Sequence, residues 1–366
     1  MQKDLSKAEG EESVVQKRIK VFLKSWFGEN SPPAKKAATI ILVVIAIFAL
    51  LEAGARMSYR IPGIVMPNAY YMFQMIPNLK PEAENSWDMP KPSITTNRDG
   101  FRVTGITQKK PPGVIRILCL GDSVTFGDLP RKDNETYPHY LQWCINWSYP
   151  DRTIQVINAG CPGYSSVQGL ELFKRKGLSY NPDIIIVGFV HHEQLPALKT
   201  DQDQMNLSPK GVKFVKSMLY GSHFYLMLRG IVAPGSLSMS YLAGAPSQLS
   251  EKMVMRVSVE QYKKTLQEFI DVAAGRKITV LFLKIPTRND GKRQMEEQHS
   301  FALREVVGKN RCHFIEMDQE MSNYRADYEF TLMADEVHPN PEGNNVMAGI
   351  IDEYMKEYGL ITERLK

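Results

Sequence analysis

The chain has few cysteines, and none of them is spaced like a pair of metal ligands. Four occur in 366 residues, and neither a Cys-x-x-Cys motif nor a Cys/His ligand spacing is found. A zinc site is therefore not expected. Four cysteines allow up to two disulfides, in three possible pairings, if the compartment is oxidising. Cys119 and Cys312 fall in runs typical of strands, so we expect these two to be packed thiols.

The chain also lacks a strong net charge. Lysine and arginine exceed aspartate and glutamate by 45 to 40, and no long basic block follows the N-terminal region. No nucleic-acid-binding motif occurs, so nucleic acid is not an expected partner. There is no internal repeat and no long low-complexity segment. The composition is that of an ordinary globular protein, with room for one large domain or two small ones.

A long apolar run stands near the N-terminus. Residues 37–51 are consecutive uncharged and mostly apolar residues, and the run continues to Ala55 with a single carboxylate, Glu52. This is close to the roughly 20 residues that a helix needs to cross a bilayer. No polar face interrupts the run, which disfavours a buried helix in a soluble core. We therefore predict a transmembrane helix over residues 37–55.

The charges around this run predict its orientation. Lys35 and Lys36 stand at its front edge, with further basic residues upstream, so the N-terminus is expected in the cytoplasm and the rest outside. A cleaved signal peptide is the alternative, because Ala-Gly-Ala at 53–55 has the form of a cleavage site. The long segment before the run favours a retained anchor. Both alternatives export the remainder of the chain to the periplasmic or extracellular side.

Two regions flank the predicted anchor. Residues 1–36 are polar and charged, so we expect a flexible cytoplasmic tail. Residues 56–113 contain many prolines and show little periodicity. They predict a connecting region that lies against the domain that follows.

From residue 114 onward, apolar runs alternate with segments of helical character. Continuous apolar strands separated by helices are typical of a parallel sheet covered on both faces. We predict an α/β fold over residues 114–358, a three-layer α/β/α domain with a central parallel sheet of about five strands. The predicted strands are 114–120, 154–158, 184–189, 278–285 and 313–317, and the predicted helices are 135–147, 166–176, 259–274, 293–307 and 343–358.

An insertion at about residues 196–250 breaks this alternation. It is longer than a single crossover requires, and long insertions often form lids or caps that contact substrate. An ordinary crossover helix with a flexible loop fits the same residues equally well, and both interpretations stay open. Arg256, which follows the insertion, is expected to form a surface salt bridge; the alternative is that it binds an anionic group near the site.

A serine stands where such sheets carry reactive groups. Residues 121–127, Gly-Asp-Ser-Val-Thr-Phe-Gly, directly follow the first predicted strand, and open α/β sheets place functional residues at the carboxyl ends of their strands. Asp335 and His338 lie three positions apart before the last predicted helix. A histidine can take the proton of a serine hydroxyl, and a carboxylate can orient that histidine. Ser123, His338 and Asp335 are therefore candidates for nucleophile, base and orienting acid.

Three blocks of the sequence resemble the SGNH/GDSL hydrolase superfamily. The first is residues 121–127. The second is Asn-Ala-Gly-Cys-Pro-Gly-Tyr-Ser-Ser at 158–166, with Gln-Gly-Leu at 168–170, and the last is Asp-Glu-Val-His-Pro at 335–339. Each block alone is modestly specific, whereas the three in this order are a strong signal. The resemblance covers about residues 97–358, and its first residues are similar to a lead-in found in membrane-anchored members.

The resemblance implies a serine esterase that acts through an acyl-enzyme. Ser123 would be the nucleophile, His338 its base, and Asp335 the residue that orients the base. The backbone N–H groups of Ser123 and Gly163 would donate to the oxyanion, where each donor is worth roughly 3 kcal/mol of barrier. No metal or organic cofactor is required for this chemistry.

The third family block departs from its usual pattern. Members of the superfamily end the third strand with Gly-x-Asn-Asp, and the asparagine side chain is a third donor to the oxyanion. Here His192 aligns with that asparagine, and a shift of one residue would place His191 there instead. A neutral imidazole can donate an N–H, so His192 is the candidate third donor. The alternative is a site with two backbone donors only.

Export and anchoring indicate substrates in the cell envelope. O-acyl groups of glycans, O-acetyl groups first among them, are expected by analogy with the family alone. Three alternatives stay open: an O-acyltransferase with the same triad, a lysophospholipase-like lipid esterase, and a non-catalytic glycan-binding subunit. The expected partners are an ester substrate and a membrane, and the sequence gives no indication of the oligomeric state.

Overall fold

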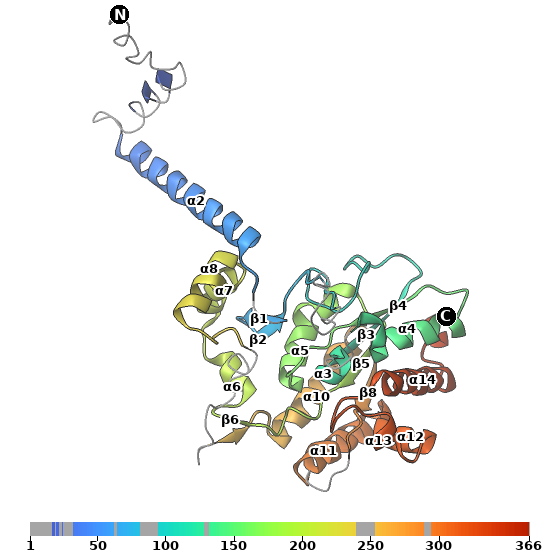
Figure 1. The fold of residues 1–366 in the computed structure, drawn as a ribbon. Helices are drawn as coiled ribbons and strands as arrows, with labels where there is room; N and C mark the ends of the chain where they lie inside the picture. Colours follow the sequence, from blue (N-terminus) through green and yellow to red (C-terminus); the bar gives the residue numbers. More distant parts are fainter. Residues whose placement is uncertain are drawn as a thin grey trace, which may run out of the picture. The chain divides into compact units, whose positions relative to one another are not determined.

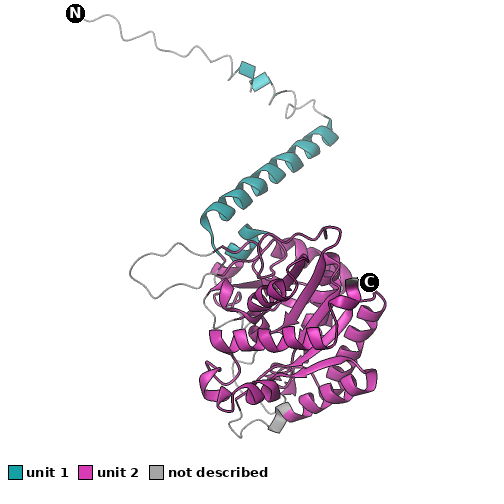
Figure 2. Cartoon of the chain, turned by 90° about the vertical axis from the view of Figure 1, so that its right-hand side faces the viewer, with its two compact units in different colours: residues 1–60, 222–228 teal, residues 61–221, 229–366 magenta. Residues whose placement is uncertain are grey.

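The computed structural model describes residues 32–61, 64–80, 94–127, 132–238, 253–288 and 294–365, with a few positions between 17 and 24. The chain divides into two compact units, residues 1–60 with 222–228, and residues 61–221 with 229–366 (Figure 2). Nearly all of the tail predicted over residues 1–36 lies outside the described residues. So does the last part of the insertion, from residue 239 onward.

The strands of the described residues all lie in the larger unit. They are β1 (Val65–Asn68), β2 (Met72–Met75), β3 (Ile115–Gly121), β4 (Ile154–Asn158), β5 (Ile184–Gly188), β6 (Pro196–Ala197), β7 (Val254–Met255), β8 (Thr279–Lys284) and β9 (His313–Glu316). The helices of the same unit are α3 (Ser123–Phe126), α4 (Tyr137–Ser148), α5 (Ser166–Arg175), α6 (Asp201–Asn206), α7 (Lys210–Tyr220), α10 (Val259–Ala274), α11 (Gln294–Asn310), α12 (Met317–Tyr324), α13 (Tyr328–Thr331) and α14 (Pro341–Glu357). Short 3-10 turns occur at Asp133–Glu135, Gly177–Tyr180 and Thr362–Leu365. α8 (His223–Val232) begins in the smaller unit, which also contains α2 (Pro33–Ser58).

Five parallel strands form the central sheet, in the order β4-β3-β5-β8-β9 (Figure 1). β3 and β5, which are neighbours in the sheet, are buried along their whole lengths, as their continuous apolar sequences predict. The register places Cys119 of β3 opposite Asn158 of β4 and Ile186 of β5. Because every pair is parallel, the carboxyl ends of all five strands meet at one edge. The predicted five-stranded sheet is confirmed, with strand ends within two residues of the prediction.

Helices cover both faces of this sheet. α4 and α14 pack together on one face, and α5, α10 and α11 pack on the other (Figure 1). α10 shows why such segments are helical: Ser258 Oγ accepts the N–H of Gln261 at 3.2 Å to begin the helix. Tyr262, Leu266 and Phe269 then bury one stripe against the sheet. The predicted three-layer α/β/α fold is confirmed.

A β-hairpin lies within the region for which the sequence predicted no regular structure. β1 and β2 pair antiparallel, and Met72 opens the second strand with a φ of 71°. The Tyr164 hydroxyl donates to the Phe73 carbonyl at 2.5 Å, and their rings meet edge to face. The hairpin therefore packs against the turn that follows β4, although its strands are too short to show a clear alternation in the sequence.

The insertion between β5 and β8 is helical where it is described. It contains α6, α7 and α8, and its two ends pair as β6 and β7 in a two-stranded antiparallel sheet. Residues 222–228 of the insertion belong to the smaller unit. The insertion is thus more than one crossover helix with a loop.

α2 spans 26 residues and is the one helix in the described part of the chain that is long and apolar enough to cross a membrane. Its side chains are almost all exposed, Val44 by 58%. A helix buried in a soluble core would show the opposite. None of the four cysteines forms a disulfide; Cys119 and Cys161 are buried, and Cys144 and Cys312 are half-buried. Cys119 is thus a packed thiol, as its strand position predicted.

Candidate active site

Ser123 lies at the carboxyl end of β3, as the first residue of the one-turn helix α3. Asp122 begins this helix: its Oδ1 accepts the N–H of Val124 at 3.0 Å. Gly127 ends the helix with a φ of 79° and donates its N–H to the Ser123 carbonyl at 2.8 Å. The short helix is fixed at both ends, and this fixes the position of the Ser123 hydroxyl.

Two glycines allow this turn to pack tightly. A Cβ on Gly121 would lie 2.0 Å from Thr125 Oγ1 and 2.8 Å from the Gly188 carbonyl oxygen. A Cβ on Gly160, which follows β4, would lie 2.3 Å from the backbone nitrogen of Phe126. The turns after β3 and β4 are therefore in direct backbone contact, which is possible only for glycine.

The loop before α14 carries Asp335 and His338. Asp335 Oδ1 accepts the backbone N–H groups of Val337 at 2.9 Å and His338 at 2.8 Å. Asn340 begins α14 by accepting the N–H of Gly343 at 2.9 Å. The Asp335 carboxylate thus organises the loop that presents the histidine ring.

The structure brings Ser123, His338 and Asp335 into one hydrogen-bonded line. Ser123 Oγ lies 2.8 Å from His338 Nε2, across 215 positions of sequence. His338 Nδ1 lies 3.0 Å and 2.9 Å from the two carboxylate oxygens of Asp335. Because Nδ1–H donates to this carboxylate, Nε2 is left to accept the hydroxyl proton of the serine. This is the arrangement that an activated serine nucleophile requires.

The charge state of Asp335 follows from its surroundings. Partial burial raises the pKa of its carboxyl. The hydrogen bonds from the Val337 N–H, the His338 ring and the His338 N–H outweigh burial and hold the pKa below its usual value. Asp335 is therefore ionised at neutral pH, as a group that accepts the histidine N–H must be.

The turn after β4 holds Gly163 in the left-handed region, with a φ of 76°. The turn is fixed to β3 because the Cys161 N–H donates to the Gly121 carbonyl at 3.0 Å. Within the turn, the Tyr164 N–H donates to the Cys161 carbonyl at 3.1 Å. On its far side the Gly163 carbonyl accepts Nη1 of Arg256 at 2.9 Å. These bonds fix the peptide planes that flank Gly163.

His192 lies beside the nucleophile turn. Its Nδ1 is 3.2 Å from Oδ2 of the fully buried Asp122, and its side chain is 20% exposed. Burial raises the pKa of Asp122, but the hydrogen bond and charge interaction with His192, with smaller contributions from His191 and the Val124 N–H, hold it below its usual value. Asp122 is therefore an ionised acceptor for Nδ1–H. It follows that Nε2 of His192 carries a proton only when the ring is an imidazolium.

Arg256 is a site residue whose place the sequence did not indicate. The expected surface salt bridge is wrong: its guanidinium is buried and binds the fully buried carboxylate of Asp201. Nη2 also donates to Gln168 Oε1 at 2.7 Å, and Ser165 Oγ donates to Asp201 Oδ2 at 2.6 Å. Ser165 and Gln168 form a capping box at the start of α5, a pattern that is visible in the sequence. Nothing in the sequence indicates that Asp201 of the insertion and Arg256, which follows the insertion, bond to this capping box.

Glu193, next to His192, is fully buried. Its Oε1 accepts the N–H of Ser166 at 2.6 Å, while Oε2 is buried with no hydrogen-bond partner among the described residues. Burial raises the pKa of Glu193, and the Ser166 bond and the nearby His299 and His192 only partly offset this. The site thus contains one buried carboxylate with a lowered pKa, Asp122, and one with a raised pKa.

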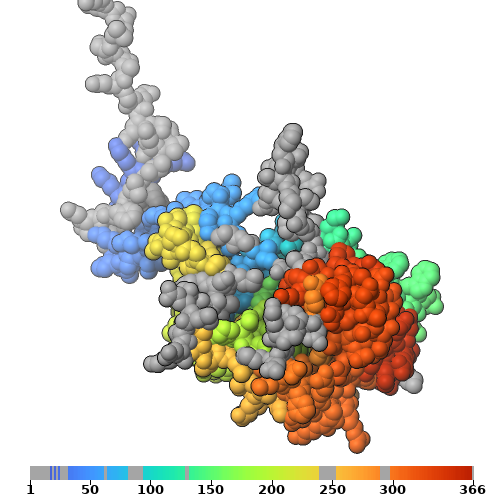
Figure 3. Space-filling model, turned by 60° about the horizontal axis from the view of Figure 1, so that its bottom comes forward, coloured from blue at the N-terminus to red at the C-terminus, as the bar shows by residue number. Residues whose placement is uncertain are grey.

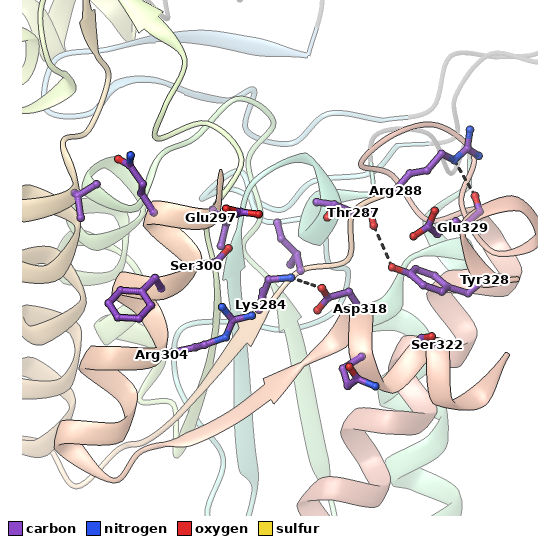
Figure 4. Close-up of a pocket in the computed structure, with 16 residues that line it drawn as sticks. Lys284, Thr287, Arg288, Glu297, Ser300, Arg304, Asp318, Ser322, Tyr328 and Glu329 are labelled. Carbon is purple, nitrogen blue, oxygen red and sulfur yellow. Dashed lines mark hydrogen bonds and ion pairs between the residues drawn. The ribbon is translucent and has the colours of Figure 1, made fainter. Parts of the chain in front are cut away.

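A cavity of about 1160 Å³ lies beside this site, at the carboxyl ends of β5 and β8 (Figure 4). Lys284 contacts Asp318 on its floor, and the Tyr328 hydroxyl donates to the Thr287 carbonyl at 3.1 Å. The Arg288 N–H donates to the carbonyl of Glu336, within the loop that carries the histidine. In the space-filling view the C-terminal segments around it, coloured orange and red, form one side of the larger unit (Figure 3). The described lining contains none of the five candidate site residues.

The five residues predicted from the sequence divide into three groups. Ser123, His338 and Asp335 are directly bonded, His192 contacts the residue before the serine, and Gly163 lies in a turn bonded to β3. Across the described ranges no group of three or more metal-binding side chains occurs. The bonded arrangement of Ser123, His338 and Asp335 can deliver the serine oxygen to a carbonyl carbon.

A known protein family matches the part of the chain that contains the serine and the histidine. The model of the GDSL-like lipase/acylhydrolase family matches residues 119–346. A search of curated proteins found no match. Similar solved structures include an α/β hydrolase from the metagenome of Lake Arreo in Spain (16% identity, 68% of this chain and 97% of that chain, TM-score 0.43), a catalytic mutant of an acetylxylan esterase from Geobacillus stearothermophilus (14%, 68% and 96%, 0.43) and a lipase/acylhydrolase from Enterococcus faecalis (17%, 67% and 96%, 0.41).

Proposed function

The chain belongs to the GDSL-like lipase/acylhydrolase family and is a serine ester hydrolase, and from this premise we propose that Ser123, His338 and Asp335 are its catalytic triad. The observation that carries the proposal is the 2.8 Å contact between Ser123 Oγ and His338 Nε2. The ionised Asp335 on the other side of the ring supports it, because the carboxylate selects the tautomer that accepts a proton at Nε2.

The reaction follows from these positions. Ser123 Oγ gives its proton to His338 Nε2 and attacks the ester carbonyl carbon, which forms a tetrahedral oxyanion. The intermediate collapses when the carbon–oxygen bond to the alcohol breaks, and the alcohol takes the proton from Nε2. A water molecule then gives a proton to Nε2 and attacks the acyl-enzyme. The acid leaves, and Oγ recovers its proton.

We assign the oxyanion hole to the backbone N–H groups of Ser123 and Gly163 and to Nε2 of His192. The serine N–H belongs to the first turn of α3, where backbone donors have no helical partner. The bonds on either side of Gly163 hold its peptide in one orientation. Because Nδ1–H of His192 already donates to Asp122, Nε2 donates only from the doubly protonated, cationic ring. The cation would also oppose the negative charge of the oxyanion directly.

The substrates that we propose are O-acyl groups of cell-envelope glycans. At about 1.5 Å per residue, the 26 residues of α2 span roughly 39 Å, more than the ~30 Å apolar core of a bilayer. Lys35 and Lys36 precede its apolar stretch and favour a cytoplasmic N-terminus. An esterase held in this way on the outer side of a membrane has envelope polymers within its reach.

Hydrolysis of p-nitrophenyl acetate and p-nitrophenyl octanoate by the full-length protein in detergent tests the proposed chemistry. Ser123→Ala should lower kcat by at least about 10³-fold, since the triad acts as a unit. Ser179→Ala is the matched control, because its hydroxyl is exposed and bonds only to the Lys176 carbonyl. A preference for acetate supports a deacetylase. Equal turnover by wild type and Ser123→Ala would contradict the triad.

A second experiment separates hydrolysis from acyl transfer. The protein is supplied with an acetyl donor and an O-deacetylated envelope glycan, and the acetylated sugar is measured against free acetate. Hydrolysis alone supports the esterase. Acetylated sugar formed faster than acetate would replace it with the acyltransferase that uses the same triad.

A further inference from the structure

α7 has its apolar side toward solvent. Helix Lys210–Tyr220 contains no fully buried residue. Its apolar side chains recur at helical spacing along one side and are all exposed, Met218 by 65% and Phe214 by 61%. We call this set the α7 apolar face; it consists of Val212, Phe214, Val215, Met218 and Leu219. An amphipathic helix on a soluble domain normally turns such a face inward.

The opposite side of α7 is the one that packs on the protein. Lys213, Lys216, Ser217 and Tyr220 are half-buried, and Lys216 Nζ donates to Ser208 Oγ at 2.7 Å. The helix also contacts β1 of the larger unit. Lysines 210, 213 and 216 recur every third residue and so lie along the polar side. The usual arrangement of a surface helix is therefore inverted, because the apolar side chains of α7 are the exposed ones.

The smaller unit shows what lies next to α7 along the chain. A single residue, Gly221, separates the end of α7 from Ser222, which is part of that unit. Ser222 Oγ donates to the Glu52 carboxylate of α2 at 2.7 Å. The backbone N–H groups of His223 and Phe224 donate to the same carboxylate at 3.0 Å.

The hydrogen bonds to Glu52 lie at the end of the apolar part of α2. Glu52 directly follows the apolar run and pairs with Arg56 at 2.7 Å. One turn earlier, the Phe48 and Phe224 rings meet edge to face at 6.2 Å. A carboxylate at the edge of the hydrocarbon needs such partners. The bonds to Glu52 therefore hold Ser222 at the level where α2 leaves the bilayer, and chain connectivity keeps the end of α7 within one residue of it.

We propose that the α7 apolar face lies in the interfacial layer of the phospholipid bilayer that α2 crosses. The inference rests on the membrane anchor of the proposed function and goes beyond it, since an anchor alone requires no second contact. Insertion of Phe214 and Met218 would cover the apolar face, while the opposite side of the helix stays packed on the protein. The inverted amphipathicity and the one-residue link to the Glu52 contact carry the proposal.

Photo-crosslinking with a lipid tests it. The full-length protein is reconstituted in vesicles of phosphatidylcholine and phosphatidylglycerol that contain a phospholipid with a diazirine near its glycerol backbone. Labelled peptides are then mapped by mass spectrometry. We expect label on the peptide containing Phe214 and Met218, and we expect the double variant Phe214→Glu/Met218→Glu to lower it at least fivefold. Trp147→Glu is the matched control, since Trp147 is an exposed aromatic residue of α4. Esterase activity reports that each variant is folded.

The outcomes distinguish membrane contact by the α7 apolar face from membrane anchoring by α2. The proposal is supported if the wild-type protein carries label on both the α7 and α2 peptides and the double variant loses label from α7 alone. Label on α2 without label on α7 overturns the α7 surface and leaves the anchor intact. No label on either helix overturns both. Protein–protein cross-links through Phe214 in place of lipid label would overturn the proposal in favour of self-association.

Discussion

Arg256 and Asp201 form a buried bidentate ion pair, with Nε 3.1 Å from Oδ1 and Nη2 2.8 Å from Oδ2. The same guanidinium donates through Nη1 to the Gly163 carbonyl, and the Asp201 N–H donates to the Arg256 carbonyl. Asp201 begins the first helix of the insertion, and Arg256 follows its last strand. One side chain therefore ties both ends of the insertion to the turn that we assign to the oxyanion hole.

Arg256→Lys should lower kcat more than it raises KM. Lysine keeps the charge opposite Asp201 but cannot supply the fork that also reaches Gly163. A shift of the Gly163 N–H by a fraction of an ångström is expected to cost about 10- to 100-fold in kcat. Steady-state hydrolysis of p-nitrophenyl acetate measures both constants. Arg325→Lys, which alters an exposed ion pair, is the control. An unchanged kcat in a folded Arg256→Lys protein would rule out this positioning role.

Removing the positive charge of Arg256 should also lower the stability of the protein. Arg256→Ala leaves the Asp201 carboxylate buried without its counter-charge, which is expected to cost about 3–5 kcal/mol of unfolding free energy. Asp201→Asn in the same background should recover part of that loss, because it removes the uncompensated charge. Denaturant unfolding in detergent compares the wild type, each single variant and the double variant. Additive effects of the two substitutions would contradict a direct pair.

His192→Ala should lower kcat by about 10²-fold, because it removes the third donor that we assign to the oxyanion hole. His192→Asn should recover part of this loss, because its amide N–H lies near the same position. The contact between Nδ1 and Asp122 Oδ2, at 3.2 Å, holds the ring that both variants remove.

Steady-state hydrolysis of p-nitrophenyl acetate measures kcat, and rates are corrected with Ser123→Ala to remove uncatalysed hydrolysis. A folded His192→Ala protein with the kcat of the wild type would show that the ring does not donate to the oxyanion.

The fold was predictable because its signals are local. Each strand of the central sheet is a continuous apolar run, and α10 was predicted with its observed ends, 259–274, because Ser258 marks its start. Ser123 and His338 were predictable as partners only through their sequence blocks, since nothing local relates residues 215 positions apart. Arg256 was misassigned because burial depends on Asp201, which lies in an insertion without a clear period.

Gly160→Ala should disrupt the nucleophile turn. Its Cβ would come within 2.3 Å of the Phe126 backbone nitrogen and 2.8 Å of its Cα, so α3 must move. We expect a loss of about 1–3 kcal/mol in unfolding free energy, together with lower kcat. Gly308→Ala is the matched control: no heavy atom lies within 4 Å of its Cβ, and it should stabilise α11 by about 0.5–1 kcal/mol. A Gly160→Ala protein with wild-type kcat would contradict the contact.

Glu193→Gln should stabilise the protein increasingly as the pH rises. Burial raises the pKa of Glu193 in the folded state above the value of about 4.3 that it has in the unfolded chain. Between those two values the folded state binds more protons than the unfolded state, so the carboxyl makes its most favourable contribution below the lower pKa. That contribution is lost as the pH rises through the folded pKa.

Glutamine keeps the oxygen that accepts the Ser166 N–H and does not ionise. Thermal unfolding in detergent at pH 4.5 and pH 8 should show a larger gain for Glu193→Gln at pH 8. The exposed Glu357→Gln is the control, and a gain that shrinks with pH would mean that Glu193 is ionised more easily in the folded protein than in the unfolded one.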